Sequence, residues 1–169
     1  LGLGHAVLCA ERAVGGDPFA VLLADDFLTD YEPGVTADLA QAFASTGKSQ
    51  LSVMEVDGPD ISKYGVIVPN DSGTGIAGLV EKPDASDAPS NLASIGRYVL
   101  TPDIFETLRY LSSGQGGEIQ LADAINVHAK KGVVENVRLN GRRFDCGSVE
   151  GFMQASQHEF VKRTHHSDD

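Results

Sequence analysis

A short apolar run that ends in two carboxylates constrains this chain more than any other stretch. Residues 19–24 read Phe-Ala-Val-Leu-Leu-Ala, and Asp25 and Asp26 follow directly. An apolar run of this length with little alternation is typical of a strand buried on both faces, as in a parallel sheet covered by helices. The carboxylates then lie at the carboxyl end of the strand, where open α/β sheets bind their ligands. We therefore expect a ligand site here, and a carboxylate in such a place can hold a divalent metal ion.

The other segments alternate between helix-like and strand-like patterns. Helices are predicted over 6–14, 36–45, 102–111, from Glu118 onward and from Ser148 onward, and strands over 50–56, 64–68, 76–81, 92–100 and 132–139. Thr36 and Ser148 are the expected N-caps of their helices. The polar segment 69–75 separates two strand-like runs, which predicts a hairpin. We therefore expect an α/β fold with a mixed, mainly parallel central sheet flanked by helices.

Length and charge bound the class of protein. The chain has 169 residues, enough for one domain with a substantial core. Its formal net charge of −11 argues against nucleic acid or an anionic membrane as a partner, because broad phosphate binding needs a basic face. A small anionic ligand stays open if a metal ion and one or two lysines supply local positive charge. No apolar run approaches membrane-spanning length, and no signal peptide is visible.

The two cysteines, Cys9 and Cys146, lack the spacing of a metal site. They predict buried thiols in a reducing compartment, and hence a cytoplasmic protein. A disulfide bridge between them stays open.

Three acidic residues are candidates for metal binding. Asp25 and Asp26 equally fit the ordinary preference of aspartate for turns and caps after a strand. If one of the two coordinates a metal ion, Asp25 is the more natural candidate because it lies nearer the strand end. Asp145 lies between Phe144 and Cys146, and a carboxylate held among apolar neighbours is costly unless it is paired or metal-bound. Together, Asp25 and Asp145 suit Mg²⁺, which is usually held by one or two carboxylates plus phosphate and water oxygens.

The segment Glu81-Lys82-Pro83 is the sharpest local motif. Pro83 favours an extended conformation for Lys82. The Lys82 ammonium suits a phosphate, and the Glu81 carboxylate suits sugar hydroxyls. Taken alone, the motif is better explained by a surface ion pair at a strand end. Gly65 and Gly2 permit close backbone approach to a ligand, although the segment around Gly2 lacks the full dinucleotide fingerprint.

Eight short motifs occur in a fixed order along the chain. They are Gly2-Leu3-Gly4-His5-Ala6-Val7, Leu22-Leu23-Ala24-Asp25, Tyr64-Gly65-Val66, Val80-Glu81-Lys82-Pro83, Ser90-Asn91-Leu92-Ala93, Gly96-Arg97-Tyr98-Val99-Leu100, Gly117-Glu118-Ile119-Gln120-Leu121 and Asp145-Cys146-Gly147. As an ordered set they resemble the motifs of bacterial UTP–glucose-1-phosphate uridylyltransferases, a branch of the sugar nucleotidylyltransferases. The resemblance extends to about residue 163. The Gly-Leu-Gly-His and Asp-Cys-Gly versions favour the uridylyl branch over the related thymidylyltransferases.

The resemblance implies a Rossmann-like nucleotidyltransferase fold and a role for each matched residue. The implied roles are a backbone contact of Gly2 with uracil, Mg²⁺ binding by Asp25 and Asp145, glucose contacts by Gly65 and Glu81, a phosphate contact by Lys82, and a place for Tyr98 in the sugar pocket. Asp25, Lys82 and Asp145 are the implied catalytic set. The implied reaction is attack of a glucose 1-phosphate oxygen on the α-phosphorus of UTP, which expels pyrophosphate without a covalent enzyme intermediate. A homo-oligomer, dimer or tetramer, is also implied.

The sequence departs from the family pattern at its start. Members begin with a strand and a glycine-rich loop whose arginine and lysine grip the triphosphate, and nothing in this chain matches that segment. We therefore expect residues 1–163 to be the C-terminal portion of a single nucleotidyltransferase domain without its N-terminal strands, residues 164–169 to be a flexible tail, and the isolated chain to be inactive. Two alternatives stay open: a thymidylyl- or other sugar-1-phosphate nucleotidylyltransferase, and a non-catalytic sugar-nucleotide-binding module.

Overall fold

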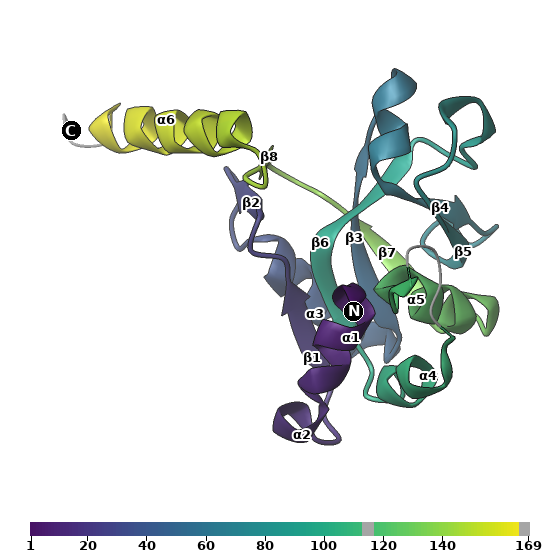
Figure 1. The fold of residues 1–169 in the computed structure, drawn as a ribbon. Helices are drawn as coiled ribbons and strands as arrows, with labels where there is room; N and C mark the ends of the chain where they lie inside the picture. The colour runs from purple at the N-terminus through teal and green to yellow at the C-terminus, as the bar shows by residue number, and fades with distance from the viewer. Residues whose placement is uncertain (113–116, 166–169) are drawn as a thin grey trace.

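A mixed six-stranded sheet runs through the middle of the molecule (Figure 1). In the computed structural model, which describes residues 1–112 and 117–165, its strands are β1 (Phe19–Leu22), β3 (Ser49–Glu55), β4 (Gly65–Pro69), β5 (Ile76–Glu81), β6 (Leu92–Leu100) and β7 (Val134–Arg138). The strand order is β5-β4-β6-β3-β7, and β1 also pairs with β6. The predicted hairpin is the β4–β5 pair.

The long strand β6 organises the sheet because three strands pair with it. β3 pairs with β6 in two stretches separated by an irregularity. β4 meets β6 near its beginning, where Val66 faces Ala93, and β1 meets it near its end, where Leu22 faces Arg97. The middle of β6, around Gly96, therefore lies between the end of β1 and the start of β4. This split in the sheet is where the candidate site forms.

The predicted α/β class, a mixed sheet flanked by helices, is confirmed, but the parallel share of the sheet is smaller than expected. Among the pairings of the described strands, β3–β7 is parallel and the others are antiparallel. The reason is the connections: β4, β5 and β6 follow one another without an α-helix, and such short connections join antiparallel strands. Two helices separate β6 from β7, which then returns parallel to β3.

The expectation that strand 19–24 is buried on both faces is wrong. β1 ends at Leu22, its residues alternate between half-buried and exposed, and the Leu22 side chain is 55% exposed. This alternation follows from its place: within the described sheet β1 is antiparallel to β6, with one face toward the core.

Helices cover both faces of the sheet. Their bounds are α1 (Gly2–Cys9), α2 (Glu11–Val14), α3 (Val35–Thr46), α4 (Ile104–Tyr110) and α5 (Leu121–Lys130), with 3₁₀ turns η1 (Gly58–Lys63) and η2 (Ala85–Asp87). The main core packs α1, α4 and α5 against one face, which includes Tyr98 and Leu100 of β6. Val99 points to the opposite face, as strand alternation requires, and packs with Val35 and Leu39 of α3.

Several predicted boundaries need correction. The first helix begins at Gly2 rather than residue 6 and is interrupted at Ala10. The helix expected from Glu118 begins at Leu121. Thr36 is not an N-cap, because α3 begins at Val35 with Gly34 in the cap position and no side-chain cap bond. The cysteines form no disulfide, but they are not buried thiols either: Cys9 is exposed and Cys146 is half-buried.

A second, two-stranded sheet leads into the last helix. β2 (Asp26–Thr29), which the sequence did not predict, pairs antiparallel with β8 (Arg142–Asp145), and Asp26 lies opposite Asp145. The helix α6 (Val149–His165) follows and projects to the side in Figure 1. Its predicted cap is confirmed, because the Ser148 hydroxyl accepts the Gly151 N–H at 3.0 Å.

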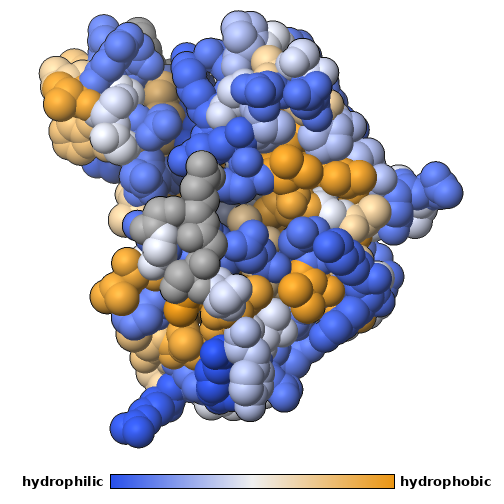
Figure 2. All heavy atoms as spheres, turned by 45° about the vertical axis from the view of Figure 1, so that its right-hand side comes forward, coloured by the Kyte–Doolittle hydropathy of each residue, from blue (hydrophilic) through white to orange (hydrophobic). Residues whose placement is uncertain are grey.

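The exposed side of α6 is rich in apolar side chains. They include Val149, Phe152, Met153 and Phe160, and Figure 2 shows orange side chains on the upper-left lobe that this helix forms. Of the expected tail, residues 164 and 165 belong to α6 and residues 166–169 lie outside the described part of the chain. Within the described part, no helix combines the length and the apolar character needed to cross a membrane.

Candidate functional site

A pocket of about 240 Å³ opens at the split between β1 and β4. Its wall combines carboxylates, an arginine, a lysine and apolar side chains from the main core. Lining residues are Leu3, Leu23, Asp25, Asp26, Lys63, Tyr64, Gly65, Leu79, Glu81, Ser94, Gly96, Tyr98, Gln120, Leu121, Ala122, Ile125, Arg143 and Asp145. The structure thus brings together five of the predicted site residues: Asp25, Gly65, Glu81, Tyr98 and Asp145.

The carboxylates of Asp25 and Asp145 both lie close to Gly147. The Cys146 N–H donates to the Asp25 carbonyl at 2.7 Å, which joins the two segments. A Cβ placed on Gly147 would lie 3.1 Å from Asp145 Oδ1 and 3.3 Å from Asp25 Oδ2, so both carboxylates border the same small space. Two carboxylates around one space fit a hard divalent cation such as Mg²⁺. Contrary to the expectation of an apolar setting, the Asp145 side chain is 54% exposed, because β8 is short and its end opens to the pocket.

Asp26 has a different environment from Asp25, although the two are adjacent in the chain. Asp25 is exposed, whereas Asp26 is 6% exposed. Asp26 Oδ2 accepts the Gly96 N–H at 2.5 Å, and Oδ1 accepts Arg143 Nε at 2.6 Å. The buried carboxylate is therefore fully occupied by protein donors, and it is Asp25 that is left facing the pocket.

Arg143 is the main cation of the site. Its guanidinium pairs with Asp26, donates to the Tyr64 hydroxyl at 3.1 Å and lies 3.7 Å from Asp145 Oδ2. Burial acts to lower the pKa of Arg143, but the charge and hydrogen bonds of Asp26 outweigh it and the pKa is raised. Arg97, which donates to the carbonyls of Leu23 and Asp26 at 3.1 Å and 2.7 Å, ties the end of β1 to the same network.

The start of β4 and the end of β5 form the other wall of the pocket. Gly65 lies opposite Glu81 in the hairpin, and a Cβ on Gly65 would meet Glu81 Oε2 at 3.0 Å. The absence of a side chain at residue 65 therefore leaves room for the Glu81 carboxylate. A polar acceptor on a backbone-lined wall suits a hydroxylated ligand.

Lys82 lies next to this wall rather than in it. Its side chain is 64% exposed, and Nζ is 4.0 Å from Glu81 Oε1, which agrees with the alternative of a surface ion pair. The predicted extended conformation is wrong, because Lys82 has φ 46°. The Lys82 N–H still donates to the Tyr64 carbonyl at 3.0 Å, and the chain turns there before the buried Pro83. The turn therefore occurs at the lysine itself.

Gly2 and Tyr98 are placed chiefly by packing. A Cβ on Gly2, which has φ 80°, would lie 2.6 Å from the Ile119 carbonyl oxygen, so the glycine permits close approach of these segments. Gly2 is absent from the residues that line the pocket, whereas its neighbour Leu3 is present. Tyr98 reaches the pocket but is 8% exposed, and burial raises its pKa to about 12.

Sequence reasoning missed Arg143, Asp26 and Tyr64 as parts of one network. A signal for Arg143 was available, because it precedes Asp145 by two residues on a strand and therefore points to the same face. The partnership of Asp26 with Arg143 depends on the pairing of β2 with β8, and β2 itself was not predicted.

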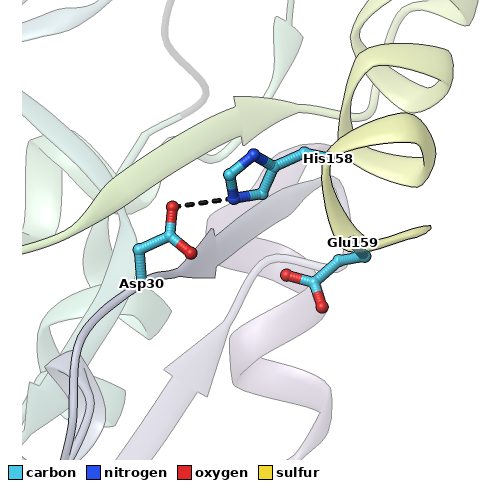
Figure 3. Close-up of side chains that lie close together, drawn as sticks. All are labelled: Asp30, His158 and Glu159. Carbon is cyan, nitrogen blue, oxygen red and sulfur yellow. Dashed lines mark ion pairs between the residues drawn. The ribbon is translucent and has the colours of Figure 1, made fainter. Parts of the chain in front are cut away.

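A second polar cluster lies outside the pocket, where β2 meets α6 (Figure 3). Asp30 Oδ2 lies 2.7 Å from His158 Nε2, and the Glu159 carboxylate is nearby. Such a group can hold a metal ion, but its acceptors already have donors: Lys162 Nζ lies 3.0 Å from Asp30, and Thr29 donates to Glu159 at 2.7 Å. The pKa of Asp30 is lowered by its hydrogen bonds with His158 and then Lys162. The cluster connects α6 to β2.

Known proteins similar to this chain include nucleotidyl and uridylyl transferases. A family model described as nucleotidyl transferase matches residues 1–160. UTP–glucose-1-phosphate uridylyltransferase of Pseudomonas aeruginosa is 45% identical over 159 residues, which cover 92% of this chain and 57% of that protein. The protein of the same name from Escherichia coli (strain K12) is 44% identical over 165 residues, which cover 91% and 54%.

Solved structures similar to this chain include UDP-glucose pyrophosphorylases. A crystal structure of UDP-glucose pyrophosphorylase complexed with UDP-glucose matches with a TM-score of 0.89 and 44% sequence identity, over 95% of this chain and 63% of that chain. The chain therefore spans a little over half the length of the curated relatives it matches.

Proposed function

The chain belongs to the nucleotidyl transferase family, and on that premise we propose that its pocket serves the transfer of a uridylyl group from UTP to glucose 1-phosphate, which gives UDP-glucose and pyrophosphate. The two relatives described above, which carry this activity in their names, are 44–45% identical to this chain. The single observation that carries the proposal is the pair Asp25 and Asp145 around one space, in the same pocket as Gly65 and Glu81. We call the part of the pocket at Asp25 and Asp145 the metal end and the part at Gly65 and Glu81 the sugar end, and this reaction needs both.

The metal end would hold Mg²⁺ through Asp25 and Asp145. When bound, Mg²⁺ neutralises phosphate charge in a nucleotidyl transfer. The protein's own contribution would be to hold the Asp145 carboxylate beside Asp25, through the Gly147 N–H, which donates to Asp145 Oδ1 at 3.1 Å, and the nearby Arg143. In a chain with a net charge of −11, this local cation also reduces repulsion of an anionic substrate.

The sugar end would orient glucose 1-phosphate. The Gly65 backbone and the Glu81 carboxylate would contact glucose hydroxyls, Tyr98 would line the sugar pocket, and Lys82 would contact the phosphate. A phosphate oxygen held in line with the α-phosphorus of UTP reacts without a covalent enzyme intermediate, so rate enhancement comes from positioning and charge. Gly2 would contact the uracil through its backbone. A cytoplasmic location and a dimeric or tetrameric state remain predictions.

The pocket volume supports a site for part of the reacting complex. Pockets that enclose drug-sized ligands are typically ~300–1,000 Å³, and this one is about 240 Å³. A sugar phosphate is a better match than a complete nucleotide sugar. Inactivity of the isolated chain is also part of the proposal.

A chimera tests the proposal. The matching segment of the E. coli relative would be replaced by this chain, and UDP-glucose formation from UTP and glucose 1-phosphate would be measured with Mg²⁺. We expect turnover, and we expect Asp25→Asn or Asp145→Asn to reduce it by about 100-fold or more, since the metal ligands are at the reacting centre.

The control is Asp71→Asn, which changes an exposed carboxylate in the β4–β5 turn. It should leave turnover unchanged. A folded chimera without turnover, or one with equal activity for dTTP and UTP, would contradict the uridylyltransferase assignment.

A further inference from the structure

We propose that Arg143 is a positioning residue that sets the orientation of the Asp145 carboxylate and links the metal end of the pocket to the sugar end. The inference rests on the proposed function, because it assigns the metal site to Asp25 and Asp145. It adds a role for a buried arginine, its anchor Asp26 and the Tyr64 hydroxyl.

The guanidinium of Arg143 is directed at protein groups on three sides. Nε donates to Asp26 Oδ1 at 2.6 Å, and one terminal nitrogen donates to the Tyr64 hydroxyl at 3.1 Å. The other terminal nitrogen pairs with the same Asp26 oxygen and lies 3.7 Å from Asp145 Oδ2. The guanidinium carbon is 5.2 Å from the centre of the Tyr64 ring, and the side chain is 12% exposed. All three nitrogens are therefore engaged, which indicates a supporting role rather than direct contact with substrate.

The anchor of this arginine is fixed by the central sheet. Asp26 accepts the backbone N–H of Gly96 in the middle of β6 with one oxygen and the Arg143 guanidinium with the other. The Asp26 side chain is 6% exposed, and breaking such a buried pair leaves an uncompensated charge. Arg143 thus cannot leave Asp26 at low cost, and its terminal nitrogen keeps a defined position 3.7 Å from Asp145 Oδ2.

Asp145 in turn has a protein neighbour at each carboxylate oxygen. Its Oδ1 accepts the Gly147 N–H at 3.1 Å, and its Oδ2 faces Arg143 at 3.7 Å. A hydrogen bond on one oxygen and a cation beside the other restrict the orientation of this carboxylate. Groups that orient a metal ligand in this way commonly change metal affinity by ~10–100-fold when they are removed.

The same arginine reaches the sugar wall. Tyr64 immediately precedes Gly65, whose partner in the hairpin is Glu81. A single guanidinium therefore connects β8, which carries Asp145, to the start of β4. Displacement of Arg143 would loosen the spacing between the two ends of the pocket.

A charge effect and a positioning effect of Arg143 predict different metal binding by a lysine variant. As a cation near Asp145, Arg143 reduces the attraction of that carboxylate for a metal ion. If charge were its main effect, a lysine in its place would leave metal binding unchanged. If positioning is its main effect, lysine keeps the charge but loses the planar fork, and metal binding weakens.

The experiment titrates the 169-residue protein with Mn²⁺ as a paramagnetic substitute for Mg²⁺ and follows free Mn²⁺ by electron paramagnetic resonance. Arg143→Lys should raise the half-saturating Mn²⁺ concentration by about 10-fold or more. Tyr64→Phe removes one acceptor of the guanidinium without changing charge and should raise it by a smaller factor. Arg142→Lys is the matched control, because this exposed neighbour lies over Phe144, and it should behave as wild type.

The possible outcomes separate the two proposals. Unchanged Mn²⁺ binding by folded Arg143→Lys and Tyr64→Phe variants would overturn the role of Arg143 and leave the proposed function intact. Wild-type protein that binds no more Mn²⁺ than the Asp25→Asn/Asp145→Asn double variant would overturn both the metal site and this inference. If circular dichroism shows that Arg143→Lys does not fold, the Tyr64→Phe titration decides: weaker binding supports the proposal, and unchanged binding overturns it.

Discussion

Asp25 and Asp26 are adjacent residues of the same type, but they differ in burial and in hydrogen-bond partners. The Asp26 carboxylate has the Gly96 N–H and Arg143 as donors and is buried, whereas Asp25 faces a pocket with Asp145 across Gly147. Burial of an ionised carboxylate requires such pairing, while an exposed one remains available to a ligand. At the residue scale, then, the site depends on which of the two aspartates has protein hydrogen-bond donors for its carboxylate and which is left for a ligand.

Gly96→Ala tests how tightly the Asp26 anchor is built. A Cβ at this position would lie 2.5 Å from Asp26 Oδ2 and 2.6 Å from Leu23 Cβ. We expect the substitution to lower the free energy of unfolding by about 1–3 kcal/mol, as overpacking typically does, measured by urea denaturation. Gly16→Ala is the control, because a Cβ there meets nothing within 4 Å. Equal stability of the two variants would show that the contact around Asp26 is loose.

Lys82→Ala tests which lysine serves the phosphate. In the active chimera we expect the KM for glucose 1-phosphate to rise about 10-fold or more, since hydrogen bonds to charged groups contribute ~1.5–3 kcal/mol, while the KM for UTP changes little. Lys63→Ala is the matched variant, because Lys63 lines the pocket but pairs with Asp60 at 2.8 Å. A rise in KM for Lys63→Ala alone would transfer the phosphate role to Lys63.

At the scale of elements, the sequence predicted those helices, strands and turns that depend on residues close together in the chain. The hairpin of β4 and β5, the long strand β6 and the Ser148 cap follow from nearby residues, and the structure contains all three. β2 escaped prediction because its four residues become a strand by pairing with β8, more than a hundred residues further along the chain. The turn at Lys82 escaped for a similar reason, since it depends on a hydrogen bond to Tyr64.

The packing of α4 against α5 predicts a pH dependence of stability. His128 of α5 is 1% exposed, its Nε2 is 2.8 Å from the Thr107 hydroxyl, and Nδ1 is 3.8 Å from Asp103. Burial lowers the pKa of His128; Asp103 acts to raise it, and Lys131 acts to lower it. Because the folded pKa lies below the unfolded value, the neutral ring is favoured by folding. Its stabilising contribution is full above about pH 6.5 and is lost as the pH falls from there through the folded pKa.

Urea denaturation between pH 5.5 and 8 measures this effect. We expect the free energy of unfolding to fall with decreasing pH below about 6.5, by at most ~1.4 kcal/mol per pH unit for one proton. His128→Gln should flatten this dependence, whereas His5→Gln should preserve it. A wild-type curve that is flat over this range would contradict the assignment.

At the scale of the whole molecule, a well-packed region, β3 and β6, and a sparsely packed one, α6, adjoin the pocket. β3 and β6 are paired along most of their length and carry core residues such as Leu51 and Leu100. In contrast, α6 buries Gly151 and Ala155 and leaves Phe152 and Phe160 exposed. Asp145 belongs to β8, directly before α6, so one metal ligand lies at the junction of the two parts. The sequence indicated the apolar residues of α6, but their exposure depends on what the helix packs against.

Hydrogen exchange should resolve this gradient. Regions with few buried contacts open independently of the core, so amides of α6 should exchange before those of β3, β6 and α5. The Asp30 cluster is one of the contacts that hold α6, through His158 and Lys162. Asp30→Asn removes the charge while retaining a residue type that tolerates the φ of 64° found there.

We expect Asp30→Asn to accelerate exchange in α6 by about 2- to 5-fold, because the variant loses a surface ion pair, without changing exchange in β3. Asp60→Asn, which removes the exposed pair with Lys63, is the control and should leave α6 unchanged. Since Asp145 is connected to α6 through Ser148, faster opening of α6 should also raise the half-saturating Mn²⁺ concentration of the Asp30→Asn variant. Exchange in α6 as slow as in β3 would show that the helix is part of the stable core. It would contradict the prediction that the Asp30 cluster affects metal binding by Asp145.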